Sequence, residues 1–188
     1  MHRPGLPTLD TALAREVFDS AFSAFLDEEG DSVAGDVSEQ NSCGRLAIYL
    51  TDAVRARGLA GYYADVEYNR KQFGQVKTIV NAQAQVIPIR CDLIVHSRGA
   101  AGLADNLIAV EMKKDRRPDT ERVADRLRLE ALTRPTNDLV VYRGGQVPVH
   151  VSGYRLGAFV LLVGRKRRCT VEYFVDGARV GSRACTFR

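Results

Sequence analysis

Two acidic residues and a lysine stand at the edges of two apolar runs in the middle of the chain. Asp92 begins the segment 92–96, and Glu111 and Lys113 close the segment 107–113. Side chains of a strand alternate between its two faces, so Glu111 and Lys113 share one face. Charged groups at buried strand ends are costly unless they are paired or bound to a metal. Two carboxylates and a lysine that converge there predict a hard-cation site suited to phosphate chemistry.

The elements that must position these residues follow from the spacing of apolar side chains. Helical periodicity predicts helices over 9–29, 39–57 and 119–132. Strand patterns occur over 62–68, 87–96, 106–114, 138–143 and 156–163. The turn signal Asp176-Gly177 predicts a hairpin with strands 171–175 and 178–183. The stretch 28–36 is acidic and contains glycine, and we expect it to be a loop.

The same periodicities predict which side chains are buried. In the strand 106–114, the face opposite Glu111 carries Ile108, Val110 and Met112. In the helix 119–132, the apolar positions are Val123, Leu127, Leu129 and Leu132. His96 stands at a strand end beside Ser97-Arg98-Gly99, which favours a histidine in a surface turn over a catalytic base.

From residue 39 onward the predicted order is helix, three strands, helix and strand. A helix that crosses between two parallel strands indicates a mixed β-sheet covered by helices, and therefore an α/β fold. A chain of 188 residues is most simply one domain. We expect an acidic helical extension over 1–38, a core over 39–163 and a C-terminal hairpin over 164–188.

Composition excludes several classes of protein. No apolar stretch reaches the roughly 18–20 residues that a membrane-spanning helix needs, and the N-terminus carries no apolar export signal, so we expect a cytoplasmic protein without a membrane partner. Its four cysteines form no C-x-x-C pair, which argues against a zinc knuckle or a redox motif. We expect them to be small core residues: Cys43, Cys91, Cys169 and Cys185.

Charge is distributed unevenly along the chain. Residues 1–40 hold nine acids and two bases, a net charge of −7, whereas the rest hold 25 bases and 14 acids, a net charge of +11. A basic body suits a polyanionic partner, and beside the Glu-x-Lys unit it favours nucleic acid. The alternative interpretation is a solvated basic surface.

The pattern Asp92…Glu111-x-Lys113 resembles the PD-(D/E)xK nuclease superfamily, which has the restriction-endonuclease-like fold. The predicted αβββαβ order is similar to that of the family, and the resemblance covers roughly residues 39–163. Two local segments, 65–70 and 106–114, are similar to bacterial and phage members of the superfamily. Cys91 stands where the family usually has a proline before the aspartate.

The resemblance implies a division of labour among the site residues. Asp92 and Glu111 would be carboxylate ligands of Mg²⁺, for which Mn²⁺ can substitute, and the backbone carbonyl of Met112 would be a further ligand. Lys113 would position the attacking water or stabilise the pentavalent phosphate. Glu39, at the start of a predicted helix, would complete the metal shell, or it simply favours the helix dipole.

Several bases are candidates for contact with nucleic acid. Arg90 shares a face with Asp92, and Lys114, Arg116 and Arg117 follow the Glu-x-Lys unit where family members often border the nucleic-acid groove. Further bases on the helix 119–132 have acids at helical spacing, and we expect most of these to form surface ion pairs.

Three functions are consistent with the sequence. The first is a metal-dependent nuclease that hydrolyses phosphodiester bonds of DNA, or less readily RNA, as a homodimer or with a targeting protein. The second is a catalytically inactive nuclease-fold protein that binds nucleic acid or a partner protein in a defence or mobile-element complex. The third is a protein-interaction module whose acidic first 40 residues form a docking arm. If that arm also mimics nucleic acid and shields the basic groove, deleting 1–35 would raise nucleic-acid affinity at low salt.

Overall fold

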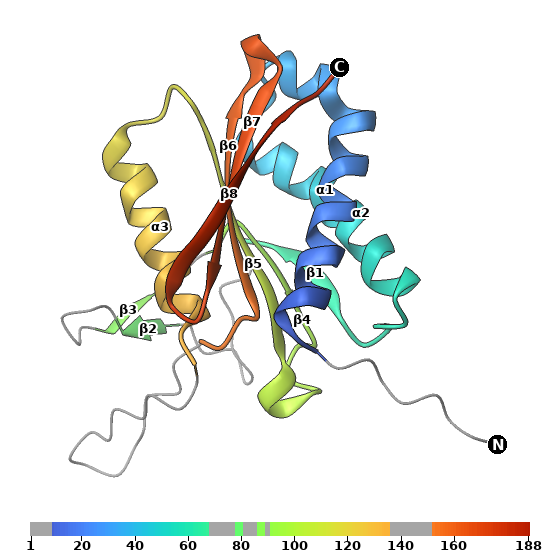
Figure 1. Cartoon of the computed structure of the whole chain (residues 1–188), viewed down its shortest axis with the longest axis vertical. Helices are drawn as coiled ribbons and strands as arrows, with labels where there is room; N and C mark the ends of the chain where they lie inside the picture. Colours follow the sequence, from blue (N-terminus) through green and yellow to red (C-terminus); the bar gives the residue numbers. More distant parts are fainter. Residues whose placement is uncertain (1–8, 68–77, 81–85, 89–90, 136–151) are drawn as a thin grey trace.

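The computed structural model describes residues 9–67, 78–80, 86–88, 91–135 and 152–188. Three α-helices cover a six-stranded sheet (Figure 1): α1 Thr11–Ala34, α2 Glu39–Ala56 and α3 Asp119–Thr133. The strands of this sheet are β1 Tyr63–Val66, β4 Leu93–His96, β5 Asn106–Lys114, β6 Leu156–Val163, β7 Arg168–Val175 and β8 Ala178–Thr186. A separate pair consists of β2 Thr78–Val80 and β3 Val86–Pro88.

The main sheet is mixed, as the order of elements predicts. Its strand order is β1-β4-β5-β6-β7-β8; β5 and β6 run parallel, and every other neighbouring pair is antiparallel. Helix α3 forms the crossover between β5 and β6. The prediction of a mixed α/β sheet with flanking helices is therefore confirmed.

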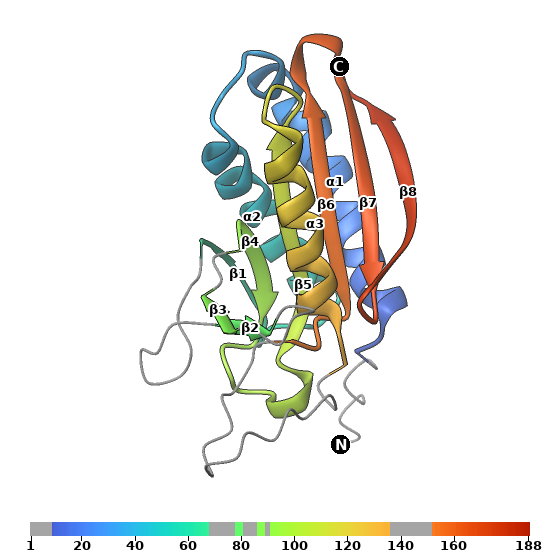
Figure 2. The same cartoon turned by 90° about the vertical axis from the view of Figure 1, so that its left-hand side faces the viewer.

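Two hydrophobic clusters occupy the two faces of the sheet. One cluster joins α1 and α2 to Ile108, Val110 and Met112, so the predicted apolar face of β5 is confirmed. The other cluster joins α3 to Ala109 and Phe159. Figure 2 shows α3 in front of the sheet, with α1 and α2 behind it. The alternation of β5 thereby directs Glu111 and Lys113 toward α3.

Helix α1 continues through the segment predicted to be an acidic loop. Glu29 is buried, and its Oε1 accepts hydrogen bonds from Arg45 and from the Tyr49 hydroxyl on α2, which offsets the cost of burying the carboxylate. Gly30 is buried as well, and a Cβ there would collide with the backbone carbonyl of Arg188. Packing against α2 and against the C-terminus therefore extends the helix to Ala34.

Burial corrects the predictions for His96 and for two apolar positions of α3, and the strand limits differ from prediction at 87–96. His96 is buried rather than in a surface turn, because it lies within β4 and its Nε2 is 2.9 Å from Asp65 Oδ2. Of the four predicted apolar positions on α3, Leu129 and Leu132 are buried as predicted, whereas Val123 and Leu127 are exposed because they lie on the other side of the helix. The predicted strand 87–96 is divided into β3 and β4, and the predicted strand 138–143 lies outside the described residues.

The cysteines divide into two kinds. Cys43 and Cys91 are free and buried, as predicted. Cys169 and Cys185 form a disulfide, which corrects the prediction that all four are isolated core residues. The hairpin register explains the difference, because it places Cys169 of β7 directly opposite Cys185 of β8.

Candidate functional site

Asp92 and Glu111 meet where β4 begins beside β5. The antiparallel register pairs Leu93 with Val110, so the next position along brings Asp92 opposite Glu111. Asp92 Oδ2 accepts a hydrogen bond of 2.9 Å from the Met112 backbone N–H. Local sequence sets these positions: the apolar run 93–95 forms the buried strand β4, and the charged Asp92 directly precedes it.

Lys113 joins the first carboxylate to helix α3. Its Nζ is 3.4 Å from Asp92 Oδ2 and 3.1 Å from Asp125 Oδ2. The same Nζ lies 3.3 Å from the carbonyl oxygen of Met112. The ammonium thus lies between the carboxylates of Asp92 and Asp125. It also lies close to the backbone of Met112, whose N–H binds Asp92.

Two residues of α3, Asp125 and Arg128, also contact these charged side chains, although the strand pattern in the sequence did not indicate them. Arg128 Nη1 donates to Glu111 Oε1 at 2.6 Å and to Asp125 Oδ1 at 3.0 Å. Helical spacing could have indicated Asp125, because it precedes the buried Leu129 by one turn and so shares its face. We name the five residues Asp92, Glu111, Lys113, Asp125 and Arg128 the ionic cluster.

Burial governs the protonation of the ionic cluster. Complete burial raises the pKa of Glu111 well above its ordinary value, and the nearby charge of Asp92 raises it further, whereas Arg128 opposes the shift. Burial also disfavours the charged forms of Lys113 and Arg128. The surrounding carboxylates outweigh this effect and raise the pKa of both bases, so both remain cationic.

The other residues predicted for the site lie on the opposite side of β5 or beyond its end. Glu39 of α2 accepts a 3.0 Å hydrogen bond from the Lys114 backbone N–H and lies 3.6 Å from Arg117 Nε. Lys114 and Arg116 both bind Asp36 in the turn between α1 and α2. Glu39 thus binds the β5 backbone two residues beyond Met112, whose N–H binds Asp92, and within the described residues it forms no three-carboxylate metal-binding group with Asp92 and Glu111. Arg90 lies outside the described residues.

Ion pairs account for most bases of α3, as expected, although not always with the nearest helical acid. Arg117, two residues before the helix, pairs with Glu121, and Arg122 pairs with Asp119. Arg126 instead reaches Glu172 on β7 at 2.8 Å. These bases fasten the helix to itself and to the sheet.

The donor set at Asp92 and Glu111 fits a hard cation. Glu111 Oε2 is buried and has no hydrogen-bond partner among the described residues, whereas most buried polar atoms have one. Asp92 is partly exposed, which leaves an approach from solvent. Within the described ranges, no three side chains of His, Cys, Asp or Glu converge as a metal-binding group. A cation there would therefore complete its shell with the Met112 carbonyl and water.

Comparison with known proteins assigns no family. No family model, no curated protein and no solved structure matches the chain. Among the described helices, none is both long enough and apolar enough to cross a membrane.

Proposed function

We propose that the chain is a metal-dependent nuclease with a restriction-endonuclease-like fold, which hydrolyses phosphodiester bonds of DNA. The observation that carries the proposal is that Asp92, just before β4, lies near Glu111 of the adjacent β5, with Lys113 Nζ 3.4 Å from Asp92 Oδ2. Two acids and a lysine at one strand end suit a phosphate that is bound through a cation. Burial of such charged groups costs free energy, which is unfavourable for a sheet with only a structural role.

Each residue of the pair has a defined part in this proposal. The Asp92 carboxylate, Glu111 Oε2 and the Met112 carbonyl would hold Mg²⁺ or Mn²⁺, and the buried Oε2 would thereby gain the partner that it lacks. When bound, the cation supplies an activated water and neutralises charge on the scissile phosphate.

Lys113 supplies a positive charge close to the Asp92 carboxylate. Its raised pKa keeps the ammonium charged, so it can stabilise negative charge that develops on the phosphate oxygens. Asp125 lies 3.1 Å from the ammonium on the side of α3 and limits where it can move. Asp125 is thus a positioning residue in this proposal, because it acts through Lys113.

A second candidate function is favoured by the pairing of Arg128. Glu111 is fully buried, and its Oε1 is already engaged by Arg128 at 2.6 Å. In a nuclease-fold protein without catalysis, the Arg128 guanidinium would take the place of a metal ion beside Glu111 and stabilise the buried carboxylate. Such a protein would bind nucleic acid or a protein partner through its basic surface.

Cleavage of a mixed DNA and RNA panel with Mg²⁺ or Mn²⁺ tests the first proposal. We would compare wild type with Asp92→Ala and Lys113→Ala, and use the exposed Lys166→Ala as the matched lysine control. We expect wild type and Lys166→Ala to cut, and both site variants to lose at least about a hundredfold in rate. Circular dichroism would verify that each variant is folded.

Binding to the same panel separates the two candidates. A folded wild type that binds nucleic acid but cuts none of the substrates with either cation would support the inactive protein. Cutting that survives Asp92→Ala would contradict the assignment of the site.

A further inference from the structure

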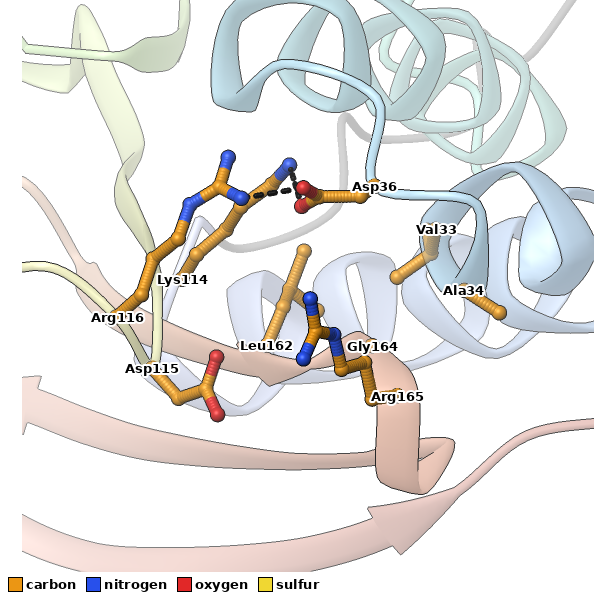
Figure 3. Close-up of a pocket in the computed structure, with 9 residues that line it drawn as sticks. All are labelled: Val33, Ala34, Asp36, Lys114, Asp115, Arg116, Leu162, Gly164 and Arg165. Atoms are coloured by element: carbon orange, nitrogen blue, oxygen red, sulfur yellow. Dashed lines mark hydrogen bonds and ion pairs between the residues drawn. The ribbon is translucent and has the colours of Figure 1, made fainter.

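A polar cavity lies beyond the ends of β5 and β6, next to the C-terminal end of α1 (Figure 3). It has a volume of about 200 Å³, and its charged lining consists of Lys114, Arg116, Arg165, Asp36 and Asp115. Because β5 and β6 are parallel, both end at this edge of the sheet. Crevices outside the carboxyl ends of parallel strands are favoured places for ligands.

Asp36 joins two of the three bases in this cavity. Its Oδ1 accepts a 2.6 Å hydrogen bond from Lys114 Nζ, and its Oδ2 accepts one from Arg116. One carboxylate thus receives charge-assisted donors from two side chains, as the oxygens of one phosphate group would. Asp36 lies in the turn between α1 and α2 with a positive φ of 68°. The cavity therefore already binds an anion, which belongs to the chain itself.

Arg165 is the base that lacks such a partner. It forms no ion pair within the part of the chain that the structure describes, in contrast to Lys114 and Arg116. Figure 3 shows its guanidinium among the side chains that line the cavity. A Cβ on the preceding Gly164 would lie 2.6 Å from the Val33 carbonyl oxygen. This close backbone approach fixes the turn that carries Arg165 against the end of α1.

We propose that this cavity binds a phosphate group, with Arg165, Lys114 and Arg116 as its ligands and Asp36 as the competing internal anion. Three bases and two acids give the lining a net charge of +1, which becomes +2 when Asp36 is removed from the count. A phosphate monoester carries between about −1.5 and −2 charges at neutral pH and complements that lining. Binding does not depend on hydrolysis at Asp92, so the two proposals can fail separately.

Calorimetric titration with inorganic phosphate, at low salt and without divalent cations, tests the site. Arg165→Gln removes the unpaired base, and Arg168→Gln removes an exposed arginine outside the cavity as the matched control. We expect saturable binding by wild type, about tenfold weaker binding by Arg165→Gln, and unchanged binding by Arg168→Gln. Equal affinities of the two variants would overturn the proposal.

Asp36→Asn tests the competition directly. Asparagine tolerates the positive φ of this position, so the turn is retained while the charge is removed. We expect phosphate to bind about tenfold more tightly to Asp36→Asn than to wild type, because Lys114 and Arg116 are then released. Unchanged affinity would refute the role of Asp36, and absence of saturable binding in both proteins would refute the site.

The phosphate group can come from a free compound or from a nucleic-acid strand, and a third titration distinguishes these sources. A mononucleotide and a single-stranded oligonucleotide would each be titrated into wild type and Arg165→Gln. Weaker binding of the strand by Arg165→Gln identifies nucleic acid as the source. Weaker binding of the mononucleotide alone identifies free phosphate compounds, and an effect on neither overturns the proposal.

Discussion

At the scale of single residues, the balance of charge around Glu111 determines what the ionic cluster can bind. Three carboxylates face two cations, so the cluster lacks one positive charge when every group is ionised. Burial raises the pKa of Glu111, which favours its neutral form and so reduces the excess of negative charge. A bound cation and Arg128 would therefore both stabilise the ionised form of the same carboxylate.

Removal of Arg128 should expose how strongly that pair is coupled. Arg128→Met should lower the free energy of unfolding by about 3 kcal/mol, because it leaves Glu111 buried without its counter-charge. Adding Glu111→Gln to that variant should restore most of the loss. Urea unfolding of wild type, both single variants and the double variant measures the coupling energy. A coupling below about 0.5 kcal/mol would show that the two side chains act independently.

At the scale of elements, α1 is attached to α2 through a buried carboxylate. The hydrogen bond from Arg45 lowers the pKa of Glu29 below its usual 4.5, although burial alone would raise it. Because the folded state favours the ionised acid, this stabilisation is present above pH 4.5 and is lost as the pH falls through the lowered pKa.

The Glu29→Gln variant tests this linkage. Its free energy of unfolding should be lower than that of wild type by about 1 kcal/mol at pH 7, because the partner Arg45 is half exposed and solvent weakens the pair. The difference should shrink when the pH is lowered from 7 to 3, because Glu29 then begins to be protonated in the folded wild type. Urea unfolding at both pH values measures the difference, with the exposed Asp27→Asn as a control on the same helix. A difference that is the same at both pH values would contradict the linkage.

The contact between α1 and the turn after β6 depends on one glycine. Gly164→Ala should lower the free energy of unfolding by about 1–3 kcal/mol, since its Cβ would press on the Val33 carbonyl and backbone must move. Gly181→Ala on β8 is the matched control, because a Cβ there meets no atom within 4 Å. Thermal unfolding of the two variants compares them. Equal stability of the two variants would mean that the backbone at the end of α1 can shift away from the new Cβ without lowering the free energy of unfolding.

At the scale of the whole molecule, helix α1 of the acidic N-terminal region is part of the core, which argues against its use as a docking arm. Helix α1 contributes Val17, Phe18, Phe22 and Phe25 to the cluster beneath the sheet, and all four are fully buried. Its acidic side chains lie on the outer surface or pair with the body, as Asp19 does with Tyr173. A helix with that burial cannot leave the sheet while the fold persists.

Deletion of residues 1–35 should therefore unfold the protein instead of raising its affinity for nucleic acid. Each buried phenylalanine of α1 is worth about 1.5–3 kcal/mol, and with the other buried apolar side chains of this helix their loss is comparable to the whole stability of a typical domain, about 5–15 kcal/mol. Circular dichroism and the thermal transition of the truncated chain check this expectation. A truncated chain with a wild-type transition would restore the docking-arm interpretation.

Local sequence determined several elements and the apolar face of β5, but it did not predict that α1 continues to Ala34 or that the segment 87–96 is divided between two sheets. The limits of β6 and the turn at Asp176-Gly177 agree with prediction, and so does the apolar face of β5, because strand periodicity and turn chemistry act over a few residues. The same alternation indicated that Glu111 and Lys113 share a face. It could not reveal what faces them.

Tertiary structure alone decided the partners of those charges. Glu111 meets Arg128 across 17 residues, and Lys113 meets Asp125, because α3 crosses back over the sheet between two parallel strands. The register of β7 and β8 likewise brought Cys169 to Cys185. Contacts of this kind depend on how elements pack, and packing is a property of the assembled core rather than of any local pattern.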